Sequence, residues 1–158
     1  LRYFNIVGSS RSGKIGLINK SDHLFKNFST QIFKKNPAFK IYGTNYPTKD
    51  GTCIRDFIHV SDIATIHSKV LDKINKKNKS VILNCGYGKG VSVKEVIKEF
   101  LNHTTKKVKV IECPRRKGDL IEIIALTKKL NNFIKWKPEF NSLKTMVKSS
   151  IKWEKFLN

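Results

Sequence analysis

Short apolar segments alternate along this sequence with stretches whose apolar residues recur every three or four positions. Short apolar runs are typical of β-strands, and the longer spacing is typical of amphipathic helices that bury one face. The strand-like segments lie at 1–7, 39–42, 54–60, 81–85 and 108–111. The helix-like segments lie at 25–33, 61–75, 92–101 and 142–151. This alternation predicts the α/β class, with strands and helices packed in layers.

Polar residues at the predicted helix starts are suited to capping the free backbone N–H groups there. Ser92 and Glu95 fit the S-x-x-E pattern of a capping box, in which each side chain binds the backbone N–H of the other residue. Ser61, followed by the acidic Asp62, is predicted to cap the helix at 61–75, and Ser142 to cap the last helix.

The charge of the chain first suggests a polyanionic partner. Basic residues outnumber acidic ones by 32 to 12 among 158 residues, a formal charge of +20. Such an excess is typical of proteins that bind nucleic acid or anionic membranes. Only five of the 32 are Arg, however, which leaves 27 Lys scattered in ones and twos, without the interleaved aromatics of a stacking surface. A solvated lysine surface is therefore favoured, and a nucleic-acid-binding module stays as the alternative.

Other function classes are excluded or disfavoured. No apolar run approaches the roughly 18–20 residues of a membrane-spanning helix. Cys53, Cys85 and Cys113 form no C-x-x-C pair, which indicates a reducing compartment and no structural zinc site. Leu1 already lies inside a strand-like segment, so we expect the sequence to be a fragment of a longer protein.

A glycine-rich loop at 86–90 resembles a dinucleotide fingerprint in its context, because it follows a strand and precedes a helix. The G-x-G-x-x-G pattern needs its third glycine at position 91, which is occupied by Val91. Turn glycines before a capped helix are therefore favoured over a phosphate loop.

Two further segments carry residues suited to an anionic ligand. Arg55 either pairs with a neighbour such as Asp56 or is held rigidly for an anion, and the nearby His59 is a less favoured candidate for a general base. In the segment 114–119, Arg116 and Asp119 flank a glycine turn that can hold a pyrophosphate and a ribose diol. A solvated basic loop explains that second segment equally well.

The order of these segments resembles the C-terminal half of the UDP-glucose 4-epimerase family, whose members are extended short-chain dehydrogenases/reductases. The resemblance is carried by LRYFN at 1–5, HL at 23–24, IYGTNYPTKDGTCIRDFIHVSD at 41–62, NCGYGKGVSVKEV at 84–96, PRRKGD at 114–119 and WKP at 136–138. The YPTKDGTCIRD stretch is the most specific, whereas LRYFN and PRRKGD also occur in sister nucleotide-sugar enzymes.

The resemblance implies a role for individual residues. Asn5, His23 and Leu24 would contact the nucleotide-sugar, and Ile41 and Tyr42 would contact the uracil. Arg55 and Arg116 would bind the diphosphate, and Asp119 would bind the ribose. Tyr3 would lie near the nicotinamide. Ile123 matches a position whose size governs the acceptance of N-acetylated sugars. The chain departs from the family at Lys26, where proline is usual, and at Phe57, where tyrosine is frequent.

The resemblance also implies an activity: NAD-dependent interconversion of UDP-galactose and UDP-glucose through a 4-keto sugar. The glycine fingerprint and the catalytic Tyr-x-x-x-Lys of the family are absent from this sequence, so we expect no catalytic residue in it and no activity from the chain alone. A sister dehydratase, decarboxylase or other epimerase is the alternative enzyme. No metal and no membrane are expected.

The implied fold is the C-terminal part of an extended Rossmann-type enzyme with a small α/β substrate domain. Strands near 1–7 and 81–85 would belong to the Rossmann sheet, while 8–53 and 87–158 would mainly build the substrate domain. We expect a cytoplasmic enzyme that forms a homodimer when complete. Because the missing half would cover a sheet edge, we expect the isolated chain to be marginally stable.

Overall fold

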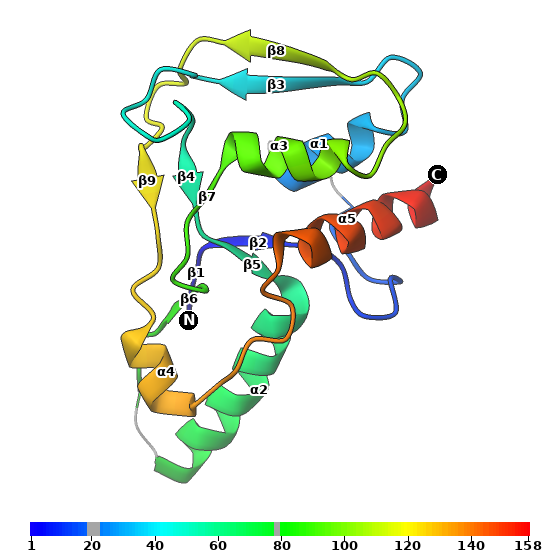
Figure 1. Cartoon of the computed structure of the whole chain (residues 1–158). Coiled ribbons are helices and arrows are strands. Elements are labelled where there is room, and N and C mark those ends of the chain that lie inside the picture. Colours follow the sequence, from blue (N-terminus) through cyan, green and yellow to red (C-terminus); the bar gives the residue numbers. More distant parts are fainter. Residues whose placement is uncertain (19–22, 78–79) are drawn as a thin grey trace.

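The computed structural model describes residues 1–18, 23–77 and 80–158 (Figure 1). Its strands are β1 (Arg2–Tyr3), β2 (Asn5–Val7), β3 (Ala38–Tyr42), β4 (Ile54–Arg55), β5 (Phe57–His59), β6 (Asn84–Cys85), β7 (Val91–Ser92), β8 (Lys109–Cys113) and β9 (Glu122–Ile123). Its helices are α1 (Leu24–Gln31), α2 (Val60–Lys77), α3 (Val93–Leu101), α4 (Lys128–Ile134) and α5 (Leu143–Leu157). The predicted mixture of strands and helices is confirmed.

The strands pair across long stretches of sequence. β1 pairs with β6 and β2 with β5, both in parallel. β3 pairs in parallel with β8, with Tyr42 opposite Cys113. β4 is the central strand of a three-stranded sheet, antiparallel to β7 and parallel to β9. Figure 1 shows β3 and β8 lying over α1 and α3, with α5 beneath these helices.

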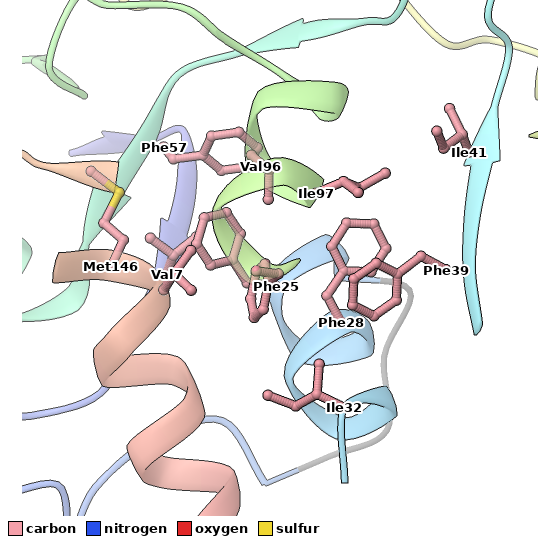
Figure 2. Packing of buried hydrophobic residues seen from close by; sticks show 12 residues of the cluster. Val7, Phe25, Phe28, Ile32, Phe39, Ile41, Phe57, Val96, Ile97 and Met146 are labelled. Atoms are coloured by element: carbon pink, nitrogen blue, oxygen red, sulfur yellow. The ribbon is translucent and has the colours of Figure 1, made fainter. Parts of the chain in front are cut away.

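An aromatic core joins β3 to the helices (Figure 2). The ring of Phe28 in α1 stacks on Phe39 in β3, with centroids 4.3 Å apart, and meets the edge of Phe100 in α3 at 5.6 Å. Phe25, which lies one turn before Phe28 in α1, also contacts the ring of Phe100. Because each buried Phe contributes about 1.5–3 kcal/mol, this cluster fixes β3 firmly against α1 and α3.

A second core lies under β5 and β6. It is built from fully buried side chains of four different segments: Ile58, Ile66, Leu83 and Leu130. The cluster packs α2 and α4 against the paired strands and keeps the carboxyl end of β5 in place.

The start of α2 differs from the sequence prediction. The helix begins at Val60, and Ser61 is its second residue rather than its N-cap, so that prediction was wrong. The Nδ1 atom of His59 accepts the N–H of Ser61 at 3.1 Å and takes over the capping role. Histidine is not among the residues preferred as helix caps, which explains why those preferences selected Ser61 instead of His59.

Three predicted strands are interrupted or shorter than expected. The strand at 1–7 breaks at Phe4, where the chain passes from pairing with β6 to pairing with β5. The strand at 54–60 breaks at Asp56, and the strand at 81–85 is reduced to Asn84–Cys85. These breaks follow from a change of pairing partner, which the local sequence does not encode.

The predicted capping box is confirmed. The hydroxyl of Ser92 accepts the N–H of Glu95 at 3.1 Å, and the carboxylate of Glu95 accepts the N–H of Ser92 at 2.8 Å. Ser142 caps α5 with a single bond, because its hydroxyl accepts the N–H of Thr145 at 3.1 Å. The short elements α4, β7 and β9 were not predicted.

Candidate functional site

A cavity of about 610 Å³ opens between α1, β3 and β4. It is lined by most of the residues predicted to bind substrate: Asn5, His23, Leu24, Tyr42, Arg55, Arg116 and Asp119. These residues come from β2, the start of α1, β3, β4 and the segment between β8 and β9. The fold thus gathers around one cavity side chains that lie more than a hundred positions apart in the sequence.

Two guanidinium groups converge on one carboxylate in this cavity. Arg116 donates to Asp119 through both Nε, at 2.9 Å, and Nη2, at 3.2 Å. The Nη2 atom of Arg55 lies 3.6 Å from the same carboxylate. Because one negative charge faces two positive ones, the cluster keeps an excess of positive charge that can attract an anion.

Tyr42 forms the wall beside this cluster. The guanidinium of Arg116 lies 5.0 Å from the centroid of the Tyr42 ring. An aromatic face next to Arg is suited to a flat ligand group beside a charged one. Phe57 also lines the cavity, so this chain has no tyrosine hydroxyl at that position.

Arg55 is positioned by its neighbour Asp56. The Asp56 carboxylate is fully buried and accepts the N–H groups of Tyr87, Gly88 and Ala125 at 2.9, 2.8 and 3.2 Å. These bonds anchor the break between β4 and β5. Two backbone N–H groups of the loop at 86–90 are therefore bound by a carboxylate of the protein itself, which supports the interpretation of its glycines as turn residues.

Polar groups of β2 and α1 form the opposite wall. The side-chain amide of Asn5 donates to the backbone oxygen of Asp56 at 3.2 Å, so it too is tied to the β4–β5 junction. Burial lowers the pKa of His23, although a hydrogen bond with the backbone of Ile6 opposes the shift. His23 is therefore neutral at pH 7 and adds no charge to the cavity.

Three predicted site residues do not line the cavity. Ile41 is only 3% exposed and its side chain lies in the aromatic core, so it cannot present a surface to a base (Figure 2). Tyr3 lies on β1, where its hydroxyl is 2.7 Å from Nε2 of His67. Ile123 lies on β9, directly opposite Arg55 in the parallel pairing.

His59 is a structural residue in this fold. It is 1% exposed, does not line the cavity, and its Nε2 lies 2.9 Å from the Ser149 hydroxyl. Burial lowers its pKa to about 4, against the opposing charge of Asp62. A neutral imidazole that accepts at Nδ1 carries its proton on Nε2, so it donates to Ser149 and is not free to act as a base.

Several cavity residues were not predicted from the sequence: Asn27, Phe28, Gln31, Ala38, Lys40, Cys53 and Val93. A signal for some of them was present. Along β3 the buried residues Phe39 and Ile41 alternate with Ala38, Lys40 and Tyr42, so the period of two already placed Lys40 on the same face as Tyr42.

Lys26, which stands where the family usually has proline, also has a structural partner. Its ammonium pairs with the buried carboxylate of Glu154, which also accepts the hydroxyl of Thr30 at 3.1 Å. This pair ties α1 to α5. Lys26 therefore supports the helix that carries one wall of the cavity.

Two other kinds of site, a metal centre and a membrane-spanning helix, are not found among the described residues. Within residues 1–18, 23–77 and 80–158, no three His, Cys, Asp or Glu side chains are grouped so that they could hold a metal ion. Within the same ranges, no helix is both long enough and apolar enough to cross a membrane.

Known proteins match this chain along nearly its whole length. The UDP-glucose 4-epimerase of Azospirillum brasilense is 36% identical over 158 residues, which cover 99% of this chain and 45% of that relative. A crystal structure of UDP-glucose-4-epimerase from Stenotrophomonas maltophila, with bound NAD and formylated UDP-arabinopyranose, superimposes with a TM-score of 0.92 at 33% identity, covering 99% of this chain and 47% of that one. The UDP-Glc/GlcNAc 4-epimerase of Campylobacter jejuni gives a TM-score of 0.80 at 39% identity, with coverages of 98% and 47%.

These matches establish the fold and the family. The chain spans less than half the length of the relatives that it matches. Its α/β architecture is that of the Rossmann-like UDP-sugar epimerases, as the resemblance implied. The model of the NAD dependent epimerase/dehydratase family matches residues 1–86, more than half of the chain. The chain therefore belongs to the NAD dependent epimerase/dehydratase family.

Proposed function

We propose that this chain is the substrate-binding part of an NAD-dependent UDP-glucose 4-epimerase. The complete enzyme would interconvert UDP-galactose and UDP-glucose. The observation that carries the proposal is the cluster of Arg55, Arg116 and Asp119 beside Tyr42, in a cavity of a size suited to a small ligand. The similarity to UDP-sugar epimerases over the whole chain supports the same function.

The charges of the cluster fit a nucleoside diphosphate. Arg55 and Arg116 would bind the two phosphate groups, because guanidinium groups bind phosphate oxygens in pairs of hydrogen bonds. Asp119 can accept hydrogen bonds from the ribose hydroxyls once the phosphates take over part of its contacts with the arginines. The edge of β3 near Tyr42 would then receive the base.

Residues near β2 and α1 would face the sugar. Asn5, His23 and Leu24 present an amide, a neutral imidazole and an apolar side chain. None of these groups carries a charge, so they would hold an uncharged hexose weakly. A weakly held sugar beside a firmly held nucleotide suits 4-epimerisation, because the 4-keto sugar must turn its other face toward the hydride donor without being released.

Tyr3 is the residue of this chain suited to contact the cofactor. Its ring is 47% exposed, and its hydroxyl is fixed by His67, so it offers a flat and oriented surface beside β1. When bound, NAD supplies the acceptor and then the donor of the hydride at C4 of the hexose. The proton of the C4 hydroxyl would be taken up by a base outside this chain, since the sequence contains no Tyr-x-x-x-Lys.

Steady-state kinetics of the complete enzyme test this proposal. We expect Arg116→Ala to raise KM for UDP-galactose about 10–100-fold, because it removes charge-assisted bonds to a phosphate. The matched control is Arg115→Ala: Arg115 lies 4.1 Å from the ring of Tyr46 and bonds to Asn45 outside the cavity, so KM should hardly change. Equal effects of the two substitutions would refute the diphosphate assignment.

The product of the same assay separates the alternatives. An epimerase converts UDP-galactose to UDP-glucose, whereas a sister dehydratase or decarboxylase would give a different product or none.

Ile123, which lies opposite Arg55 in the parallel pairing, is the residue we propose for the acceptance of N-acetylated sugars. Ile123→Gly should increase activity on UDP-N-acetylgalactosamine relative to UDP-galactose, and an unchanged ratio would contradict this role.

A further inference from the structure

Lys40 is a cavity residue for which the proposed function has no role. It lies in the middle of β3, between Ala38 and Tyr42, and all three residues line the cavity. In the part of the chain that the structure describes, its ammonium makes no hydrogen bond and no ion pair. Among the described residues that line the cavity, Asp119 is the only one with a carboxylate, and it is bound by Arg116 and lies near Arg55.

The backbone of β3 around Lys40 also faces the cavity side. The oxygen of Pro37 accepts the N–H of Lys109, and the N–H of Gly43 donates to the oxygen of Cys113, so odd-numbered residues bond to β8. The N–H and C=O groups of Ala38, Lys40 and Tyr42 therefore point to the other edge of β3. Consistent with this, the N–H of Ala38 donates to the side chain of Gln31 in α1, at 3.5 Å.

The cavity therefore has two ends along β3. At one end, Arg116 lies over Tyr42 and binds Asp119. At the other end, Lys40 and the amide side chains of Asn27 and Gln31 are near an unpaired strand edge. A nucleotide whose diphosphate lies at the arginine end would extend its base along this edge of β3, past Tyr42 and toward Lys40.

We propose that Lys40 makes this site selective for a pyrimidine with a carbonyl oxygen at position 4, such as uracil, over one with an amino group there, such as cytosine. The inference rests on the proposed function and names the residue that distinguishes the base. An ammonium group has three donors and no acceptor. It therefore attracts the carbonyl oxygen of uracil and repels the amino group of cytosine, which also donates.

Calorimetric binding of UDP, CDP and UMP to the complete enzyme tests the inference. Lys40→Met removes the charge and keeps the length of the side chain. We expect it to weaken UDP binding about tenfold and CDP binding less than twofold, with UMP weakened as much as UDP. Lys40→Arg should restore most of the preference for UDP.

Lys109→Met is the matched control. Lys109 is an exposed lysine of the paired strand β8 that does not line the cavity, so its replacement changes the net charge equally and should alter neither affinity. Equal weakening of UDP and CDP by Lys40→Met would place the ammonium on the diphosphate and overturn the inference. Unchanged affinities would show a solvated lysine and would also overturn it. A wild-type enzyme that does not bind UDP would instead refute the proposed function.

Discussion

Asp56, which follows β4, and Asp119, in the segment between β8 and β9, show how differently this fold uses two carboxylates. Asp56 is fully buried and accepts three backbone N–H groups. Asp119 lies at the wall of a cavity and is bound by the side chain of Arg116, with Arg55 close by. The first carboxylate joins two loops to a strand, and the second holds two positive groups next to an open space.

This difference separates a structural site from a binding site. Backbone donors cannot turn away without unfolding a loop, so the contacts of Asp56 stay in place whatever occupies the cavity. Arginine side chains can change rotamer at a modest cost, so the contacts of Asp119 can be exchanged for those of a ligand. Substitutions at the two positions should therefore affect different quantities.

The largest expected effect is on stability, at Asp56. Asp56→Ala leaves three buried N–H groups without an acceptor, and we expect a loss of about 3–5 kcal/mol of unfolding free energy. Urea denaturation of the complete enzyme measures it. Asp72→Ala, at an exposed position of α2, is the control and should cost less than about 0.5 kcal/mol. Similar losses for both would show that the Asp56 contacts do not stabilise the fold.

A pH effect on stability is expected from His59, which, like Asp56, binds a backbone N–H. Its pKa is about 4 in the folded protein against 6.5 for the free side chain, so the unfolded state binds a proton first as the pH falls. Above pH 6.5 the imidazole is neutral in both the folded and the unfolded state, so His59 causes no loss of stability there. Between pH 6.5 and 4, stability should decline by up to about 1.4 kcal/mol per pH unit.

Denaturation at pH 7.5, 6.5, 5.5 and 4.5 checks this window. The matched variant is His59→Gln, which cannot be protonated and should flatten the part of the curve that belongs to this residue. If the unfolding free energy fell with pH equally in the wild type and the variant, the pKa of His59 would be the same in the folded and unfolded states, which would contradict the prediction.

At Asp119 we expect an effect on binding rather than on stability. Asp119→Asn keeps the size of the side chain and removes its charge, so the two arginines lose the group that orients them. We expect KM for UDP-galactose to rise about tenfold while the unfolding free energy changes by less than about 1 kcal/mol. A large loss of stability would place Asp119 in the same class as Asp56.

The smallest expected effect is the loss of unfolding free energy when either of two helix-capping serines is replaced. Ser92 caps α3 and also donates to the carboxylate of Asp50, whereas Ser142 caps α5 and shares a hydrogen bond with the hydroxyl of Thr145. We expect Ser142→Ala to cost about 0.5–1 kcal/mol and Ser92→Ala to cost more, about 1–2 kcal/mol. Equal costs in urea denaturation would mean that the bond to Asp50 adds nothing.

The sequence predicted best those features that depend on neighbours in the chain. The capping box of Ser92 and Glu95 needs only a spacing of three, and the family motifs named seven of the fifteen described residues that line the cavity. The breaks at Phe4 and Asp56 could not be predicted, because they depend on pairing with β6 and on N–H groups more than thirty residues away. Alternation along β3 places the side chain of Ile41 in the core, so of the two residues assigned to the base only Tyr42 lines the cavity.

Affinity for UDP compared with uridine tests the central claim most directly. If the arginine cluster anchors the diphosphate, the complete enzyme should bind UDP at least about 100-fold more tightly than uridine, since each charge-assisted phosphate contact adds about 1.5–3 kcal/mol. Arg55→Met should remove much of that difference and leave uridine binding unchanged. Equal affinities for UDP and uridine in the wild-type enzyme would contradict the account.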